Sequence, residues 1–201
     1  MSAPSALRNR EVIAQALQRL APQEGRALEI ASGTGEHVIH LAETMPKMIW
    51  HPTDLDEARL RSIAAWVSRI GLPNIHPPKH LDAAAAGWAA REVPFDLILT
   101  VNLLHLVSDS EAATILTETA QALAPQGVAI IYGPFLRDGI ATSEGDATFD
   151  ASLRAQDPLI GYKDVARVSA QLQAAGLTLT ERLEMPANNL MLAFTNPSAP
   201  A

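Results

Sequence analysis

The sequence predicts an α/β fold in which a mainly parallel sheet is covered by helices on both faces. Short apolar runs alternate with longer amphipathic ones along the chain, and strands that alternate with helices form this kind of sheet. With 48% hydrophobic and 18% charged residues, the composition is that of a globular protein. A length of 201 residues suits one domain with a full core, so we expect a single domain over residues 1–201.

The strands and helices follow in order from the hydrophobic pattern. The parallel strands are predicted at "RALEIA", "MIWHPTD", a weak "NIHPP" broken by its prolines, "FDLILTV" and "VAIIYG". Helices are predicted from Gly35 to Thr44, at "EARLRSIAAWVSRI" before Gly71, at "EAATILTETAQAL", and from Asp164 to Ala175. Only "PANN" separates "LTLTERLEM" from "LMLAFTN", so we expect these two strands to pair antiparallel.

Residues 133–163 lack a long periodic run. A connection of this length is uncommon in a compact domain and is usually functional or disordered. It follows the carboxyl end of the fifth strand, at the edge where open α/β sheets bind ligands. We predict a substrate lid or insertion here; the alternative is a surface excursion with a short helix.

Composition excludes several classes of function. The formal net charge is −7 and no long basic cluster occurs, so we expect no nucleic-acid partner. Without cysteine, disulfides, thiolate metal sites and thiol nucleophiles are excluded. No segment is long and apolar enough to cross a bilayer, and the N-terminus does not resemble a signal peptide. We expect a cytoplasmic protein with no membrane partner, either a monomer or a homodimer.

The stretch "LEIASGTGEH" forms the first turn between a strand and a helix, at the ligand-binding edge. It does not complete the dinucleotide pattern G-x-G-x-x-G, because the third glycine position is Val38 counted from Gly33, or Glu36 counted from Ala31. A carboxylate at Glu36 would also lie beside a phosphate, which argues against NAD. No P-loop pattern occurs. Gly33 and Gly35 either let the backbone approach a ribose and an amino-acid tail or form a structural turn only.

Three acidic residues and one leucine complete the predicted ligand site around this turn. Glu29 can face an ammonium or sulfonium group, and Asp54, at the tip of the second strand, can accept both ribose hydroxyls. Leu55 can cover one face of an adenine, and Asp82 can accept from its amino group. Each feature alone has a structural reading, since a surface aspartate is usually structural. Their order along the chain indicates an S-adenosylmethionine site.

Several stretches carry a family resemblance. They are "LEIASGTGEH", "WHPTDLDE", "NLLHLV", "YGPF", "FDASLRAQDPLIGYKD" and "MPANNL". In this order they resemble a family of class I methyltransferase-like proteins that includes methyltransferase-like protein twenty-six, over nearly the whole chain. The resemblance implies a three-layer, Rossmann-like class I methyltransferase fold whose seven-stranded sheet is mainly parallel with an antiparallel last strand.

The resemblance also implies S-adenosylmethionine binding at the positions that match the family's motifs. These are Glu29, Gly33, Gly35, Asp54 and Asp82, and Ala31 lies in the same turn. Where the family often reads W-Q-P-S-D, this chain reads W-H-P-T-D, which keeps the acid in place. The resemblance does not identify the methyl acceptor.

Catalytic candidates lie at the tips of the fourth and fifth strands. Asn102 is expected to contact the methionine end of the cofactor. His105 can act as a general base, or it can cap a helix or bond a backbone carbonyl. Tyr132 and Phe135 either form a wall of the acceptor site or serve in the core or at a lid hinge.

Further candidates come from the irregular stretch and the two ends of the chain. Arg154 and the catalytic candidate Asp157 can orient a polar acceptor, or they can pair with each other. Asn188 and Asn189 are pocket candidates, although asparagine is favoured in hairpin turns for backbone reasons alone. Arg8 and Asn9 are expected on an N-terminal helix, where they either close over the site or only decorate the helix surface.

The remaining motifs disfavour other chemistry. The histidine pairs His37/His40 and His76/His80 lack a supporting acid pattern, so we expect no metal. No G-x-S-x-G elbow occurs, which disfavours a serine hydrolase. The sequence thus predicts an S-adenosylmethionine-dependent methyltransferase acting on a small molecule. A non-catalytic S-adenosylmethionine-binding sensor or partner-binding protein is the alternative.

Overall fold

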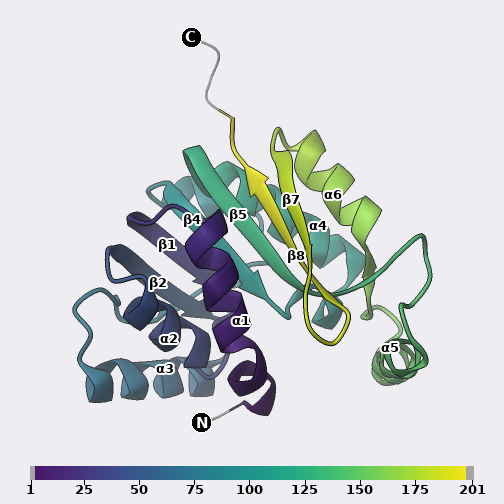
Figure 1. Cartoon of the computed structure of the whole chain (residues 1–201), viewed down its shortest axis with the longest axis horizontal. Coiled ribbons are helices and arrows are strands. Elements are labelled where there is room, and N and C mark those ends of the chain that lie inside the picture. Colours follow the sequence, from purple (N-terminus) through teal and green to yellow (C-terminus); the bar gives the residue numbers. More distant parts are fainter. Residues whose placement is uncertain (1–2, 198–201) are drawn as a thin grey trace.

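The computed structural model describes residues 3–197 and shows a twisted sheet between two layers of helices (Figure 1). Seven strands form one path in the order β3-β2-β1-β4-β5-β8-β7, and the short β6 pairs with the end of β5. The strands are β1 (Gly25–Ile30), β2 (Met48–Asp54), β3 (Lys79–His80), β4 (Phe95–Val101), β5 (Leu123–Leu136), β6 (Lys163–Asp164), β7 (Thr178–Glu184) and β8 (Asn189–Thr195). The predicted α/β class is confirmed.

The parallel and antiparallel parts of the sheet are arranged as the sequence predicts. β1 pairs in parallel with β2 and β4, and β4 with β5. β8 is antiparallel to both of its neighbours, β5 and β7. The carboxyl ends of β1, β2, β4 and β5 therefore lie at one edge of the sheet, where ligands bind in open α/β folds.

Residues 3–197 contain six α-helices, of which the first precedes β1 and the others lie between strands. They are α1 (Pro4–Leu20), α2 (Glu36–Thr44), α3 (Glu57–Ile70), α4 (Asp109–Ala122), α5 (Glu144–Gln156) and α6 (Val165–Ala174). Local sequence sets their ends: Pro4 lies in the first turn of α1, Asp56 caps α3, and Ser108 forms a capping box with Glu111 on α4. None of these helices, within residues 3–197, is long and apolar enough to cross a membrane.

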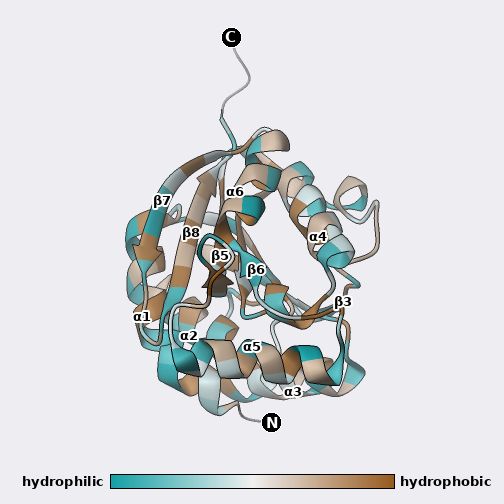
Figure 2. Cartoon of the chain, turned by 90° about the vertical axis from the view of Figure 1, so that its right-hand side faces the viewer, coloured by the Kyte–Doolittle hydropathy of each residue, from teal (hydrophilic) through white to brown (hydrophobic). Residues whose placement is uncertain are grey.

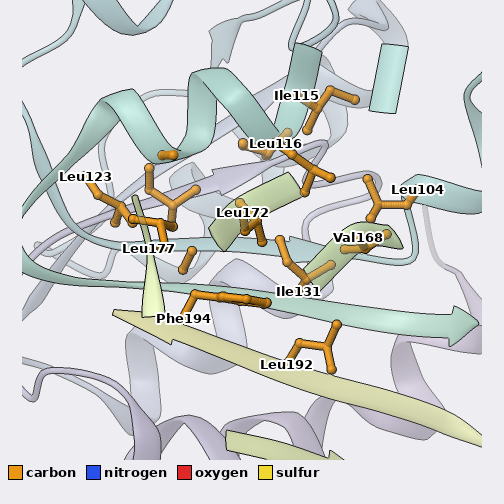
Figure 3. Packing of buried hydrophobic residues seen from close by; sticks show 14 of the residues in the cluster. Leu104, Ile115, Leu116, Leu123, Ile131, Val168, Leu172, Leu177, Leu192 and Phe194 are labelled. Carbon is orange, nitrogen blue, oxygen red and sulfur yellow. The ribbon is translucent and has the colours of Figure 1, made fainter. Parts of the chain in front are cut away.

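The two helical layers pack on opposite faces of the sheet and give two hydrophobic clusters. One contains residues of α1, α2 and α3, including Ile13, Val38 and Ile63. The other contains residues of α4 and α6, where Leu116 and Leu172 approach the sheet residues beneath them (Figure 3). Both faces of the central strands are covered, which explains their nearly continuous apolar sequences.

Two predicted segments differ from the structure. The third strand lies at Lys79–His80, and the predicted "NIHPP" forms only a bridge between Trp50 and Ile75, because Pro77 and Pro78 have no N–H to donate to a ladder. The stretch 133–163 holds the thirteen-residue α5, which lies across one end of the sheet (Figure 2). Its movement as a lid stays a prediction.

Candidate functional site

A cavity of about 640 Å³ lies at the carboxyl edge of the sheet. Its walls come from α1, the turn after β1, the loop after β4, α5 and the β7–β8 hairpin. Six residues predicted from the sequence line it: Arg8, Ala31, Gly33, Asn102, His105 and Asn189. Segments far apart in the chain thus meet at the edge where the topology places a ligand.

The turn after β1 is held in an unusual backbone conformation by β2. Ala31 and Gly33 have φ of 54° and 59°, in the left-handed region. The N–H of Ser32 donates to the carbonyl of Thr53 at 2.7 Å, and the N–H of Gly33 donates to Asp54 Oδ2 at 2.9 Å. A non-glycine residue such as Ala31 pays strain for such a φ, and strain of this kind concentrates at ligand sites.

Glycine is required at the two positions of the turn for different physical reasons. A Cβ on Gly33 would meet nothing within 4 Å, because this glycine borders the cavity. A Cβ on Gly35 would lie 3.3 Å from the Cα of Ile63, so this glycine lets α2 begin close against α3. The sequence predicts for both glycines either a ligand contact or a structural turn only; in the structure Gly33 borders the cavity and Gly35 packs against Ile63.

The pKa of Glu29 departs strongly from that of an ordinary glutamate. Glu29 lies at the end of β1, is 1% exposed, and its Oε2 has no hydrogen-bond partner among the described residues. Burial raises the pKa of Glu29 to about 8; the Ser32 hydroxyl opposes this shift and the Asp54 charge adds to it. Glu29 is not itself among the residues that line the cavity, but Ala31, Ser32 and Gly33 after it in the chain are. A buried carboxyl group with an unpaired oxygen at the start of such a turn is a candidate contact for a cationic ligand.

The other two predicted acids are placed differently. Asp54 is 2% exposed, and its carboxylate accepts from the N–H of Gly33 and of Asp56, both at 2.9 Å. It thus connects the glycine turn to the tip of β2. Asp82 is exposed and accepts from the N–H of Ala84, and neither acid is among the residues lining the cavity.

The loop after β4 supplies Asn102 and His105. Asn102 has φ of 55°, and its N–H donates to the carbonyl of Tyr132 at 2.8 Å. His105 is 7% exposed, and burial together with the nearby Lys163 lowers its pKa to about 4. A neutral imidazole with this pKa is a weak base, which limits its use in removing a proton from an alcohol.

Tyr132 and Phe135 belong to the core. Tyr132 is 2% exposed and hydrogen-bonds through its side chain to Asn9, whose Oδ1 lies 2.8 Å from His37 Nε2. Phe135 is 3% exposed in the cluster beneath α4 and α6. Of the two readings of these aromatic residues, the structure favours the core; Asn9 braces α1 and does not face the cavity.

Arg154 and Asp157 do not pair with each other, which was the alternative to their orienting a polar acceptor. Arg154 Nε lies 3.0 Å from Asp150 Oδ2, one turn earlier on α5, and Arg154 lines a separate cavity of about 540 Å³. Asp157 ends α5 and accepts from the N–H of Leu159 at 2.9 Å. Neither residue is among those that line the cavity with the glycine turn.

Of the two asparagines in the hairpin between β7 and β8, one bonds to α5 and the other lines the cavity. Asn188 has φ of 58° and its Nδ2 donates to Asp146 at 2.8 Å, which connects the hairpin to α5. Asn189 lines the cavity while its Nδ2 donates to the carbonyl of Pro186. Leu55 is 57% exposed at the start of the loop after β2.

The family to which the chain belongs follows from comparison of its whole sequence. The model of one family, described as "Protein of unknown function (DUF938)", matches residues 1–196. The chain belongs to the DUF938 family. The structure of this DUF938 protein is similar to that of an O-methyltransferase family protein from Burkholderia thailandensis, with a TM-score of 0.80 at 14% identity over 97% of this chain and 57% of that one.

Two further solved structures share the fold. One is the S-adenosylmethionine-dependent methyltransferase SibL, with a TM-score of 0.76, 18% identity and coverage of 96% of this chain and 55% of SibL. The other is YcgJ from Bacillus subtilis, with a TM-score of 0.73, 12% identity and coverage of 96% and 99%. The DUF938 chain therefore has the Rossmann-like methyltransferase fold, and it spans little more than half the length of the first two proteins.

Sequence reasoning missed two aromatic residues of the DUF938 cavity, Phe149 on α5 and Tyr162 before β6. Their rings and the ring of His105 contact one another edge-on, with all three centroid distances at 6.1 Å. The spacing of Phe149 and the buried Leu153 by four residues was the available signal for a helix face. Within the described residues, no group of three or more metal-ligating side chains is found.

Proposed function

We propose that this protein is an S-adenosylmethionine-dependent methyltransferase that acts on a small molecule. The proposal rests on one observation: the carboxyl group of Glu29, buried and with one unpaired oxygen, lies at the end of β1, and the strained turn that follows it, with Ala31 and Gly33, borders the cavity. Membership of a methyltransferase fold supports the proposal but is not itself evidence of activity.

The chain's residues fit S-adenosylmethionine. A carboxyl group with one unpaired oxygen can accept from an ammonium group or face a sulfonium, and the open space over Gly33 lets a ligand approach the backbone. We assign Glu29, Ala31, Gly33 and Asn102 to the methionine end. For the adenosine end we assign Asp54 to the ribose and Leu55 and Asp82 to the base.

Gly35 supports this site indirectly. Because it lets α2 start against α3, it fixes the direction in which the glycine turn leaves β1. Asp54 fixes the other end of the turn through its bond from the Gly33 N–H. The backbone that would meet the ligand is thus preorganised by two contacts.

Methyl transfer is an in-line displacement. The acceptor's lone pair forms a bond to the methyl carbon, the carbon–sulfur bond breaks, and the sulfur keeps the electron pair; a proton on the acceptor leaves to solvent. The protein's main contribution is to hold the two reactants close and aligned, an effect that reaches about 7–11 kcal/mol in favourable cases. His105, neutral at physiological pH, can accept a hydrogen bond from the acceptor and so orient it.

A small acceptor suits the size of the cavity. Its volume of about 640 Å³ lies within the range of roughly 300–1,000 Å³ found for small-molecule sites. The net charge of −7 gives no support to a nucleic-acid substrate. A cytoplasmic location and identity with the methyltransferase-like protein twenty-six family are part of the same proposal.

Calorimetry with S-adenosylmethionine and mass spectrometry of products from a broad metabolite pool test the proposal together. We expect binding, and a methylated product from at least one acceptor. NADH serves as the control ligand and should not bind. Binding without any methylated product would favour the non-catalytic alternative, and failure to bind S-adenosylmethionine would refute both readings.

A further inference from the structure

The acceptor side of the cavity combines one unpaired cation with a cluster of aromatic rings. Arg8 lines the cavity from α1, and no partner for its guanidinium is found among residues 3–197. Phe149, 46% exposed, lines it from α5 beside Tyr162. We propose that the acceptor is a small planar aromatic molecule that carries an acidic group, which Arg8 binds while the ring packs against Phe149 and Tyr162; this rests on the function proposed above.

The other charged side chains that line the cavity, apart from its histidines, have partners within the protein. Glu36 accepts at Oε1 from the N–H of Ala3 at 2.7 Å and at Oε2 from the hydroxyl of Thr34. Arg59 lies 3.8 Å from the buried Asp54 carboxylate. Arg8 thus differs from Glu36 and Arg59, the other charged side chains besides histidine that line this cavity, because no carboxylate or hydrogen-bond partner for it is found among residues 3–197.

The cavity's histidines do not add a competing charge. Burial is the main cause that lowers the pKa of both His37 and His105 to about 4, so both are neutral at pH 7. His37 is also bonded to Asn9 through Nε2. A planar guanidinium binds a carboxylate through two parallel hydrogen bonds, and the acid that lines the cavity, Glu36, already accepts a hydrogen bond at each oxygen.

The aromatic residues form a wall for a flat ring. The rings of His105, Phe149 and Tyr162 are inclined to one another by 62°, 66° and 68°, in edge-to-face contact. Their mutual packing holds Phe149 in place although it remains half-exposed. Aromatic pairs gain stability beyond the apolar area that they bury, so a planar aromatic ligand is favoured over an aliphatic one.

The stretch that carries Phe149 and Tyr162 is firmly built. Asp150 Oδ1 accepts from the N–H of Tyr162 at 2.6 Å, and the Lys163 ammonium donates to the carbonyls of Val107 and Gly161. The N–H of Gly161 in turn donates to the carbonyl of His105 at 3.0 Å. The aromatic wall is therefore fastened to the loop after β4, which carries the other site residues.

Binding of matched ligand pairs tests the proposal. The probes are benzoate, 1-naphthoate and indole-3-carboxylate, each compared with its primary carboxamide, in the presence of S-adenosylhomocysteine, which has no methyl group to transfer. We expect at least one acid to bind about tenfold or more tightly than its amide. In Arg8→Ala this preference should disappear, and in Arg8→Lys part of it should remain. Arg10→Ala, on the same helix and outside the cavity, should keep it.

A second pair of variants tests the aromatic wall. Phe149→Ala should weaken acid and amide alike, by about tenfold, because it removes ring contact and not charge. Leu159→Ala removes a similarly exposed apolar side chain outside the cavity and should bind both as the wild type does. Circular dichroism checks that each variant is folded.

Three results would overturn the acceptor proposal while leaving the proposed function intact. The first is binding of S-adenosylhomocysteine with no binding of any probe. The second is equal binding of acids and amides. The third is a loss of preference in Arg10→Ala as large as in Arg8→Ala. If S-adenosylhomocysteine itself does not bind, the function proposed above fails, and the acceptor proposal fails with it.

Discussion

Replacing Glu29 by glutamine should change how the stability of the protein depends on pH. The pKa of Glu29 is raised from the model-compound value of 4.5 to about 8 in the folded protein, mainly by burial. The folded state therefore holds this proton more tightly than the unfolded state does. The stability that this proton contributes is fully present below pH 4.5. It is lost as the pH rises from 4.5 to 8, and it no longer changes above pH 8.

The size of the effect follows from the two pKa values. A shift from 4.5 to about 8 corresponds to roughly 5 kcal/mol at most, with about 1 kcal/mol already lost at pH 5. Between pH 5 and pH 9 the wild type should thus lose about 4 kcal/mol that Glu29→Gln does not lose. Urea denaturation of both proteins at each pH measures this, since the other titrating groups cancel in the difference.

Ligand binding supplies the second readout. A cation beside Glu29 favours the charged carboxylate, so binding of S-adenosylmethionine at pH 7 should release close to one proton from this mostly protonated group. Calorimetry in two buffers of different ionisation enthalpy measures that number. A difference in stability of under about 1 kcal/mol between pH 5 and pH 9, with no proton release, would show that Glu29 is neither strongly perturbed nor a ligand contact.

Three further predictions concern neighbouring residues. Asp54→Ala should weaken S-adenosylmethionine binding by about 1.5–3 kcal/mol, the value of a charge-assisted hydrogen bond, and unchanged affinity in calorimetry would remove Asp54 from the ribose site. Gly33→Ala and Gly35→Ala both add strain at positive φ, but only the second brings a Cβ to 3.3 Å from Ile63. Gly35→Ala should therefore lower the melting temperature more, while Gly33→Ala should weaken the ligand more; equal effects on both readouts would contradict the two roles. The pKa of His105 is lowered to about 4, so its ring signals in a nuclear magnetic resonance titration should stay constant from pH 5.5 to 8, and a midpoint near 6.5 would show that the ring is solvated.

Much of the sheet can be predicted because its strands are buried on both faces and read as apolar runs. "MIWHPTD" and "FDLILTV" match β2 and β4 from end to end. The hairpin of β7 and β8 was predicted from the short "PANN" between them. In contrast, α5 has one buried residue, Leu153, so its periodicity is weak, and the sequence predicts a short helix in residues 133–163 only as the alternative to a lid.

The site could be predicted from the sequence only where strand order and the turns after the strands determine its position. The glycine turn and the acids at strand tips follow from topology, since parallel strands bring their carboxyl ends to one edge. The contribution of Phe149 depends on how α5 folds back over that edge, and the packing role of Gly35 depends on the approach of α3. These are tertiary contacts between segments distant in the chain, and neither residue type nor spacing encodes them locally.

The position of β8 has a consequence for the order in which the sheet assembles. Residues 189–195 are the last strand in the chain, yet they lie between β5 and β7 and hydrogen-bond to both. During synthesis the ribosome releases β5 and β7 before the strand that joins them exists, so one flank of β5 stays unpaired until then. Pairing of β1, β2 and β4 needs no such wait, which makes closure around Asn189–Thr195 a late, long-range event in folding.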